Sequence, residues 1–172
     1  MNQQVSIVMG SDSDLSIMSK SAAVLEDFHV RYEVKICSAH RSPKETHMFA
    51  SSLEKRGIKV VIAGAGGAAH LAGVIASYVS CPVIGIPMQS TYLAGVDSLL
   101  SVVQMPSGVP VATVGINAAE NAALLAIQIL AVSDKKLQFQ LVEYKKKLAK
   151  GVLVKSEKLQ RVGYKKYLQS NL

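Results

Sequence analysis

Three short polar or glycine-rich stretches of the chain carry the side chains best suited to chemistry. They read GSDSD at 10–14, SAHRS at 38–42 and GAGGAAH at 64–70, and two of them contain a histidine, His40 and His70. Histidine changes charge near neutral pH, which makes it a common proton donor and acceptor in catalysis. One such histidine is often only a surface residue. Two of them, each shortly after a predicted strand, favour an acid–base role.

The GSDSD stretch lies between a predicted strand and a predicted helix. Ser11, Ser13 and Asp14 are good helix caps, and capping alone could explain them. Serine hydroxyls and free backbone N–H groups at a helix start also bind anions such as phosphate, and Gly10 would let a ligand approach closely. A carboxylate repels phosphate but accepts hydrogen bonds from sugar hydroxyls. The stretch therefore fits either capping or the binding of a phosphorylated sugar.

The GAGGAA part of the third stretch matches the relaxed GxGxxA pattern of dinucleotide-binding proteins. Those proteins carry an acidic residue about 20 residues further on, which holds the ribose. No Asp or Glu occurs here between Glu54 and Asp97, and this argues against a dinucleotide site. The remaining interpretation is a turn whose small residues leave room for a flat ligand and offer it backbone N–H groups.

The sequence contains few signs of a metal site or of a catalytic nucleophile. The sequence has no HxxxH or HxH pair, and the spacing of His40 and His47 suits no common ligand set, so we expect no metal. It has no GxSxG elbow either. The two cysteines, Cys37 and Cys81, form no CxxC motif, which fits a reducing compartment better than a disulfide scaffold or a zinc ribbon. Acid–base catalysis by histidine is the chemistry that remains.

The elements that would position these stretches alternate between β-branched runs and helical segments. We predict five strands, with helices between them, at 5–9, 30–36, 59–67, 82–87 and 109–116. Such alternation is typical of βαβ units around a parallel sheet. The predicted fold class is therefore α/β, a flavodoxin-like three-layer sandwich with a parallel sheet of about five strands and a C-terminal helical extension. Its ligands bind outside the carboxyl ends of the strands, where all three stretches fall.

The helix after the SAHRS stretch has the clearest boundary signals. Ser42 as the cap, Pro43 at the first helical position and Glu45 three residues after the cap make up a capping box. We expect this helix to continue to about Arg56 and to stop at Gly57.

Charge separates a body from a tail. The length of 172 residues indicates one domain, with a catalytic part at 1–134 and, within the same domain, a basic helical extension at 135–172. The tail holds eleven of the nineteen basic residues and two of the twelve acidic ones, which leaves the body at −2 in a chain of net charge +7. Without an aromatic-rich strand pattern or zinc spacing, this tail favours one or two solvated helices over nucleic-acid binding.

Other features of the composition limit location and assembly. Hydrophobic residues make up 49% of the chain, which is rich for a monomer and favours a homo-oligomer. No run of about 18 apolar residues predicts a membrane span, and the first residues lack the basic start of a signal peptide. We therefore expect a cytoplasmic protein that contacts neither membrane nor nucleic acid.

Together and in this order, the three stretches resemble the N5-carboxyaminoimidazole ribonucleotide mutase family of purine biosynthesis. That family carries a G-S-x-S-D turn, an S-A-H-R loop and a G-A-G-G-A-A-H-L turn, which stand here at Gly10–Asp14, Ser38–Arg41 and Gly64–Leu71. Segment 97–116 is similar as well, and the resemblance covers about residues 4–140. It implies a flavodoxin-like subunit, an octamer with active sites shared between subunits, and a reaction that needs no ATP, metal or redox cofactor.

The resemblance also implies roles for individual residues. Ser11, Ser13 and Arg41 would hold the substrate phosphate, Asp14 would accept from ribose hydroxyls, and His40 would be the single proton shuttle. The further substrate-binding residues that it implies, mostly through backbone groups around the base and the carboxylate, are Gly10, Ser38, Ala39, Ala65, Gly66, Gly67, His70 and Leu71. For His70 we expect either support of the pocket wall or donation to the carboxylate.

The implied reaction moves a carboxylate from the exocyclic nitrogen of an aminoimidazole ribonucleotide to C4, with His40 acting first as acid and then as base. Two alternatives stay open. A related branch with most of the same motifs carboxylates aminoimidazole ribonucleotide directly with CO2, although segment 97–116 looks more like the mutase branch. The second alternative is a non-catalytic flavodoxin-like module that binds a phosphorylated ligand. Such a module would need no histidine at position 40.

Overall fold

The computed structural model describes residues 3–91 and 93–169. Five strands form one sheet in the order β2-β1-β3-β4-β5, and every neighbouring pair is parallel. The strands are β1 (Val5–Met9), β2 (Tyr32–Ile36), β3 (Val60–Gly66), β4 (Val83–Met88) and β5 (Ala112–Thr113). The predicted fold class is confirmed. The central strands are continuous buried apolar runs because helices cover both of their faces.

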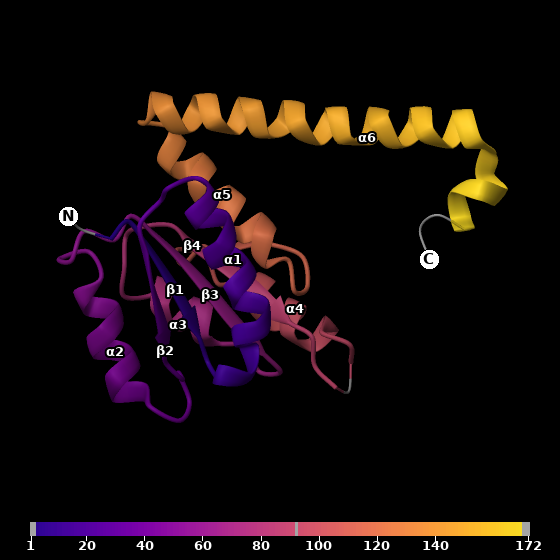
Figure 1. The fold of residues 1–172 in the computed structure, drawn as a ribbon. Helices are drawn as coiled ribbons and strands as arrows, with labels where there is room; N and C mark the ends of the chain where they lie inside the picture. The colour runs from indigo at the N-terminus through magenta and orange to yellow at the C-terminus, as the bar shows by residue number, and fades with distance from the viewer. Residues whose placement is uncertain (1–2, 92, 170–172) are drawn as a thin grey trace.

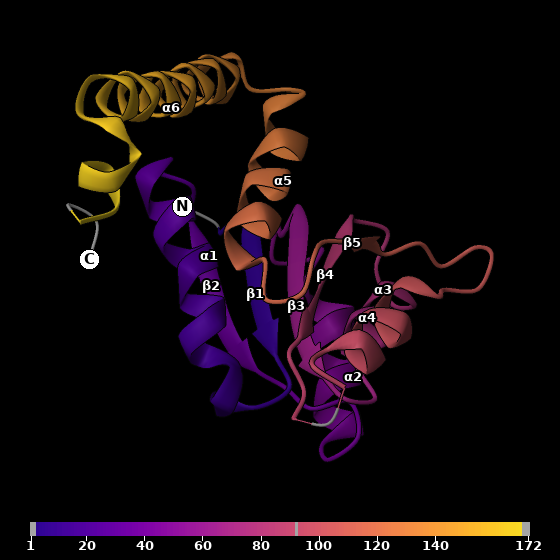
Figure 2. The ribbon, with the colours of Figure 1, turned by 90° about the vertical axis from the view of Figure 1, so that its right-hand side faces the viewer.

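Helices lie on both sides of the sheet, which makes three layers (Figure 2). Helices α1 (Leu15–Asp27) and α5 (Ala119–Ala131) cover one face, and α2 (Pro43–Ser52), α3 (Leu71–Ala76) and α4 (Val96–Val103) cover the other. Each face has its own buried cluster, one centred on β1, α1 and α5 and the other on β3, α2 and α3. Gly85 on β4 permits the close approach of the second layer, since a Cβ there would lie 2.3 Å from Val102 Cγ1.

The strand order fixes where a ligand can bind. In this order the chain reverses its direction of winding between β1 and β3, so the loops that follow these two strands diverge to opposite faces of the sheet. The divergence opens a crevice at the carboxyl ends of the strands. The stretches at 10–14 and 64–70 come from the two strands that flank this crevice, and 38–42 follows β2 next to them.

Helix α2 differs from the prediction at both ends. Pro43 is the first helical residue as expected, but the Ser42 hydroxyl makes no cap bond. It accepts from the Ser38 N–H at 3.3 Å and donates to the Ser38 carbonyl at 3.1 Å instead. The predicted capping box is therefore wrong, because the preceding loop competes for the hydroxyl. The helix ends at Ser52, and Gly57, at φ 86°, closes the turn that follows.

Strand β5 is much shorter than the predicted 109–116. Only Ala112 and Thr113 pair with β4, opposite Ile84 and Gly85. Pro110 lacks the N–H that a ladder needs, which keeps the start of this segment out of the sheet. The sheet consequently ends in a weak edge at β5.

The basic extension, α6 (Lys135–Gln169), is a long helix and a short one joined by a kink at Gly163, where φ is 75° and ψ is 157°. It leaves α5 and projects from the body as an arm (Figure 1). Near its start Leu137 is buried and Tyr144 packs on Phe28, with ring centroids 5.6 Å apart. Over the described residues, neither this helix nor any other combines the length and the apolar character needed to cross a membrane.

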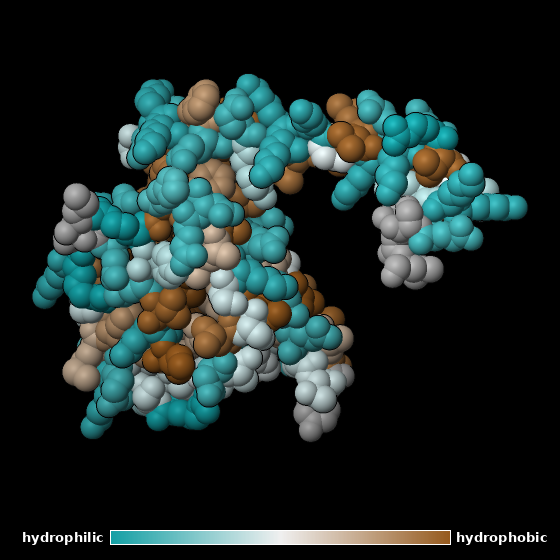
Figure 3. Space-filling view, viewed as in Figure 1, coloured by the Kyte–Doolittle hydropathy of each residue, from teal (hydrophilic) through white to brown (hydrophobic). Residues whose placement is uncertain are grey.

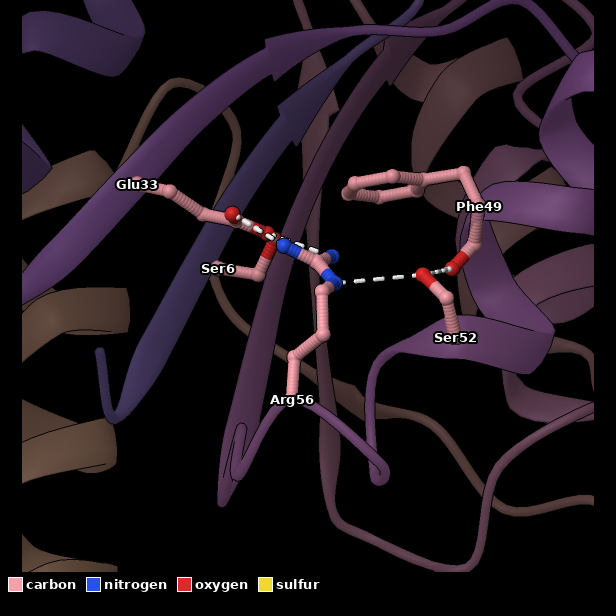
Figure 4. Close-up of polar contacts among 5 residues, drawn as sticks. All are labelled: Ser6, Glu33, Phe49, Ser52 and Arg56. Atoms are coloured by element: carbon pink, nitrogen blue, oxygen red, sulfur yellow. Dashed lines mark hydrogen bonds and ion pairs between the residues drawn. The ribbon is translucent and has the colours of Figure 1, made fainter. Parts of the chain in front are cut away.

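A partly buried ion pair ties β2 to the segment after α2 (Figure 4). The Arg56 guanidinium donates to both carboxylate oxygens of Glu33, with Nη2 2.9 Å from Oε1. Ser6 donates to the same carboxylate at 2.9 Å, and Ser52 accepts from Arg56 Nε at 3.1 Å. The guanidinium also lies over the Phe49 ring, 5.2 Å from its centroid. Paired donors and a half-buried carboxylate make this the sort of ion pair that contributes to stability.

We expect Arg56→Ala to lower the free energy of unfolding by about 1–2 kcal/mol, because it leaves the Glu33 carboxylate, 16% exposed, without its bidentate partner. Lys146→Ala is the control, since it breaks an ion pair with Glu143 whose side chains are 68% and 48% exposed. That loss should stay within about 0.5 kcal/mol. Urea unfolding of both variants measures the difference, and equal losses would contradict a stabilising role for the Arg56 pair.

Candidate active site

A cavity of about 370 Å³ lies at the carboxyl ends of β1, β2 and β3. The residues that line it are Gly10, Ser11, Ser13, Asp14, Ser38, Ala39, His40, Arg41, Ala65, Gly66, Ala68, His70 and Leu71. The three stretches singled out in the sequence therefore meet in one pocket. Of the residues predicted for the site only Gly67 is not part of the lining, and Ala68 is a lining residue that the prediction omitted.

The loop after β1 forms the first wall of the pocket. Ser11 is the N-cap of a short 3-10 helix, Asp12–Asp14, and its hydroxyl accepts from the Ser13 N–H at 3.4 Å. The Ser13 hydroxyl reaches Asp14 Oδ1 at 3.4 Å. Ser11 thus caps the short helix and also lines the pocket. The wall offers a ligand two hydroxyls and one carboxylate.

The loop after β2 forms the second wall, and Arg41 links it to the first. Arg41 Nη2 donates to the Gly10 carbonyl at 2.6 Å, while its backbone N–H and its Nε reach the Ser38 hydroxyl at 3.2 and 3.4 Å. The guanidinium therefore lies across the mouth of the pocket with its orientation fixed. Arginine has five N–H donors, so donors remain for an anion bound between the two loops.

His40 and His70 form a pair inside the pocket. His40 Nε2 lies 2.9 Å from His70 Nδ1, and the rings meet edge to face with centroids 4.9 Å apart and an interplanar angle of 80°. In such a contact one nitrogen donates and the other accepts, so the tautomer of each ring fixes that of the other. His70 can thereby orient His40 and set which of its nitrogens carries the proton. The sequence indicated both histidines but not their direct contact.

The end of β3 and the turn after it form the third wall, where Ala65, Gly66 and Ala68 line the pocket. Gly67 has φ 63°, and its N–H donates to the Ser98 hydroxyl at 2.8 Å, behind the wall. The sequence interpretation did not single out Ser98. A serine among the apolar residues of the α4 segment was the available signal, since a buried hydroxyl needs a hydrogen-bond partner.

Asp14 has an unusual electrostatic environment. Burial raises the pKa of its carboxyl above the ordinary 3.8, against smaller lowering effects from the Ser13 hydroxyl and the Arg41 guanidinium, and Asp12 adds a small further rise. The folded protein therefore holds a charge there at a cost. Charged groups that destabilise the folded protein in this way are common in sites that bind a ligand.

We expect Asp14→Asn to stabilise the free protein at pH 7, because the amide removes a partly desolvated charge. A carboxyl whose pKa is raised on folding binds its proton more tightly in the folded state, so the wild type loses stability as pH rises from below 3.8 through the folded pKa. The gain from the substitution should then shrink as the pH falls and vanish below about 3.8. Thermal melts of both proteins at pH 7 and pH 3.5 measure this, and a gain that is independent of pH would contradict it.

Metal ligands do not gather in the described part of the chain: it has no group of three or more His, Cys, Asp or Glu side chains placed to hold an ion. The residues of the pocket suit an organic anion with hydroxyl groups. They supply an arginine, two serines, one carboxylate and a histidine pair.

Strand order and pocket position define the chain as a doubly wound α/β protein with a ligand site at the switch point between β1 and β3. Residues 4–151 match the model of the AIR carboxylase family. The chain belongs to this family.

Individual relatives agree with this assignment. The chain is 54% identical to the N5-carboxyaminoimidazole ribonucleotide mutase of Pyrococcus abyssi, over 96% of this chain and 95% of the relative. It is 51% identical to the protein of the same name from Thermotoga maritima, over 96% of each. The phosphoribosylaminoimidazole carboxylase of Saccharomyces cerevisiae is 54% identical over 96% of this chain but only 29% of its own length. Treponema denticola PurE superimposes with a TM-score of 0.84 at 31% identity, over 91% of this chain and 98% of that one. The resemblance noted from the sequence motifs is confirmed.

Proposed function

We propose that this protein is an N5-carboxyaminoimidazole ribonucleotide mutase of de novo purine biosynthesis, acting in the cytoplasm. The observation that carries the proposal is the meeting of a histidine pair and an arginine-linked pair of serine-rich loops in one pocket. The near full-length relatives that bear this name support it. Residues 1–134 would form the catalytic part, and 135–172 would be an extension of the same domain.

In this proposal the substrate phosphate lies between the first two walls. Ser11, Ser13 and the free donors of Arg41 would bind it, and the Asp14 carboxylate would accept from the ribose hydroxyls. The backbone around Ser38, Ala39, Ala65 and Gly66 would surround the base and its carboxylate, with Gly10, Ala68 and Leu71 completing the lining. Because the Gly67 N–H is taken by Ser98, we assign Gly67 a role in shaping the turn.

The chemistry would need one proton carrier. As the N–CO2 bond breaks, His40 gives a proton to the exocyclic nitrogen, and the electron pair of the bond stays on that nitrogen. C4 then attacks the released CO2, and the now neutral His40 removes the C4 proton. His40 delivers one proton to the exocyclic nitrogen and takes one back from C4, so it ends in its starting protonation state. The isomerisation therefore needs no net acid, base or cofactor. CO2 must not escape between the steps, and this requires a site closed to water.

Carboxylation of aminoimidazole ribonucleotide with CO2 is the second candidate, because relatives named as carboxylases are as similar as the mutases, including the yeast protein at 54% identity. The two activities separate in an assay of the purified protein. A mutase converts the N5-carboxylated ribonucleotide quickly and gains little from added bicarbonate. Fast product formation from bicarbonate and the uncarboxylated ribonucleotide alone would favour the carboxylase, and no product from either would refute both enzymatic functions.

We further propose that the protein works as a homo-oligomer, an octamer as in the family resemblance. His40 and Arg41 are exposed in the isolated chain, so a neighbouring subunit would have to close the pocket. Helix α6 offers apolar surface for assembly, with Phe139 66% and Val152 67% exposed. Brown hydrophobic patches lie among teal hydrophilic residues along the arm (Figure 3). Burial of such patches between copies is a common source of oligomer stability.

Light scattering on the full chain at micromolar concentration tests the assembly. We expect a single species several times the 18.3 kDa subunit mass. Replacing both Val152 and Leu153, exposed apolar residues of the arm, with lysine should lower the mass. A stable monomer of the unaltered chain would refute the oligomer and, with it, the closure of the pocket by a neighbouring subunit.

A further inference from the structure

Helix α4 holds the turn after β3 through one buried hydroxyl. Ser98 is 0% exposed, and its Oγ accepts from the Gly67 N–H at 2.8 Å. The next turn of the helix adds a weaker contact, because the Ser101 hydroxyl lies 3.4 Å from the Gly67 carbonyl oxygen while it bonds the Asp97 carbonyl at 2.8 Å. The peptide groups on both sides of Gly67 therefore face α4.

Ala69, further along the turn, is buried in the core, but Gly67 itself has no such packing. Gly67 has φ 63°, in the left-handed region, and a Cβ built there would meet no atom within 4 Å. Side-chain packing thus does not fix the position of Gly67. The bond to Ser98 is the shorter of the two hydrogen bonds between Gly67 and α4, and it favours this conformation of the turn over others open to glycine.

A short chain of contacts connects this turn to the histidine pair. The Ala68 carbonyl, next after Gly67, accepts from the His70 N–H at 2.8 Å. His70 Nδ1 lies 2.9 Å from His40 Nε2. A shift of the turn would therefore move His70 and, through it, change the orientation and the preferred tautomer of His40.

We propose that Ser98 is a positioning residue for the proton shuttle, acting on His40 through Gly67 and His70. Its effect on rate rests on the proposed mutase function, whereas its effect on the geometry of the histidines does not. Since Ser98 is not among the residues that line the pocket, where phosphate and ribose would bind, it should act on kcat and leave KM nearly unchanged.

We expect Ser98→Ala to lower kcat about 10- to 100-fold, the order of loss that follows a small misplacement of a reacting group, with KM within about twofold. Ser21→Ala is the matched control. Ser21 is also 0% exposed and donates to one backbone carbonyl, that of Ala119, at 2.7 Å on the opposite face of the sheet. It should lower the melting temperature comparably and leave kcat unchanged.

A spectroscopic readout keeps the test independent of the proposed reaction. The ring nitrogen chemical shifts of His40 and His70 report their tautomers, and they should change in Ser98→Ala but not in Ser21→Ala. If Ser98→Ala does not fold, Ser98→Thr and Ser98→Val make the same comparison, because the two side chains have the same shape and only threonine keeps the hydroxyl. The threonine variant should retain the wild-type histidine shifts and the valine variant should not.

Unchanged histidine shifts in the variants without a hydroxyl would overturn the positioning role, whatever the activity. A raised KM with unchanged kcat would overturn it as well. An inactive wild-type protein whose histidine shifts still respond to Ser98 would refute the proposed function and leave the positioning role standing.

Discussion

His40→Asn should leave a folded protein that binds the proposed substrate but turns it over about 10²- to 10⁴-fold more slowly, the loss typical for a general acid–base group. The fold should persist because the side chain is exposed and its contact in the structure is with His70. Asparagine keeps the size and a polar partner for His70 but cannot deliver a proton. The loss could exceed this range, because the same residue would act in both proton transfers.

Two other histidines provide controls for this prediction. His29 has φ 57°, a left-handed conformation that asparagine tolerates well, and His47 makes an edge contact with Tyr78, with ring centroids 4.6 Å apart. His29→Asn and His47→Asn should leave turnover nearly unchanged. Steady-state kinetics and substrate titration of the three variants are the measurements. More than about a tenth of wild-type turnover in His40→Asn would transfer the shuttle role to His70.

Arg41→Ala should raise KM about 10- to 150-fold with a much smaller change in kcat. A charge-assisted contact to a remote phosphate acts alike on ground and transition states, and it is worth about 1.5–3 kcal/mol. Loss of the guanidinium also removes its bond to the Gly10 carbonyl, which links the first two walls. It should raise the pKa of Asp14 further, since the nearby Arg41 charge lowers that pKa in the wild type.

Arg41→Lys and Arg56→Ala separate these effects. Lysine keeps the charge but lacks the fork of donors that spans Gly10 and Ser38, so its KM should fall between those of the wild type and Arg41→Ala. Arg56→Ala removes an arginine that pairs with Glu33 away from the pocket, and it should cost stability without changing KM. An Arg41→Ala variant with unchanged KM and greatly reduced kcat would contradict the phosphate role.

The sequence by itself determined the α/β class and the place of the site. Apolar runs such as 5–9 and 59–67, separated by helical segments, are local patterns of the sequence, and their alternation is typical of βαβ units. Parallel strands bring their carboxyl ends to one edge, so the loops at 10–14, 38–42 and 64–70 had to meet there. That is why the predicted site residues, apart from Gly67, line one cavity.

Only the tertiary structure decided which groups within those loops contact one another. The His40–His70 contact spans 30 residues of sequence and depends on the register of β1 against β2 and β3. The pairing of β4 with β3 and the packing of α4 on these strands place Ser98, 31 residues beyond Gly67, against the turn. Ser98 thereby takes the N–H that the sequence had assigned to a ligand. Ser42 likewise bonds back to Ser38 and not to its own helix. A polar side chain can form hydrogen bonds with any group that folding brings near it, and many of these groups are distant in sequence. Its partner therefore cannot be read from its sequence neighbours alone.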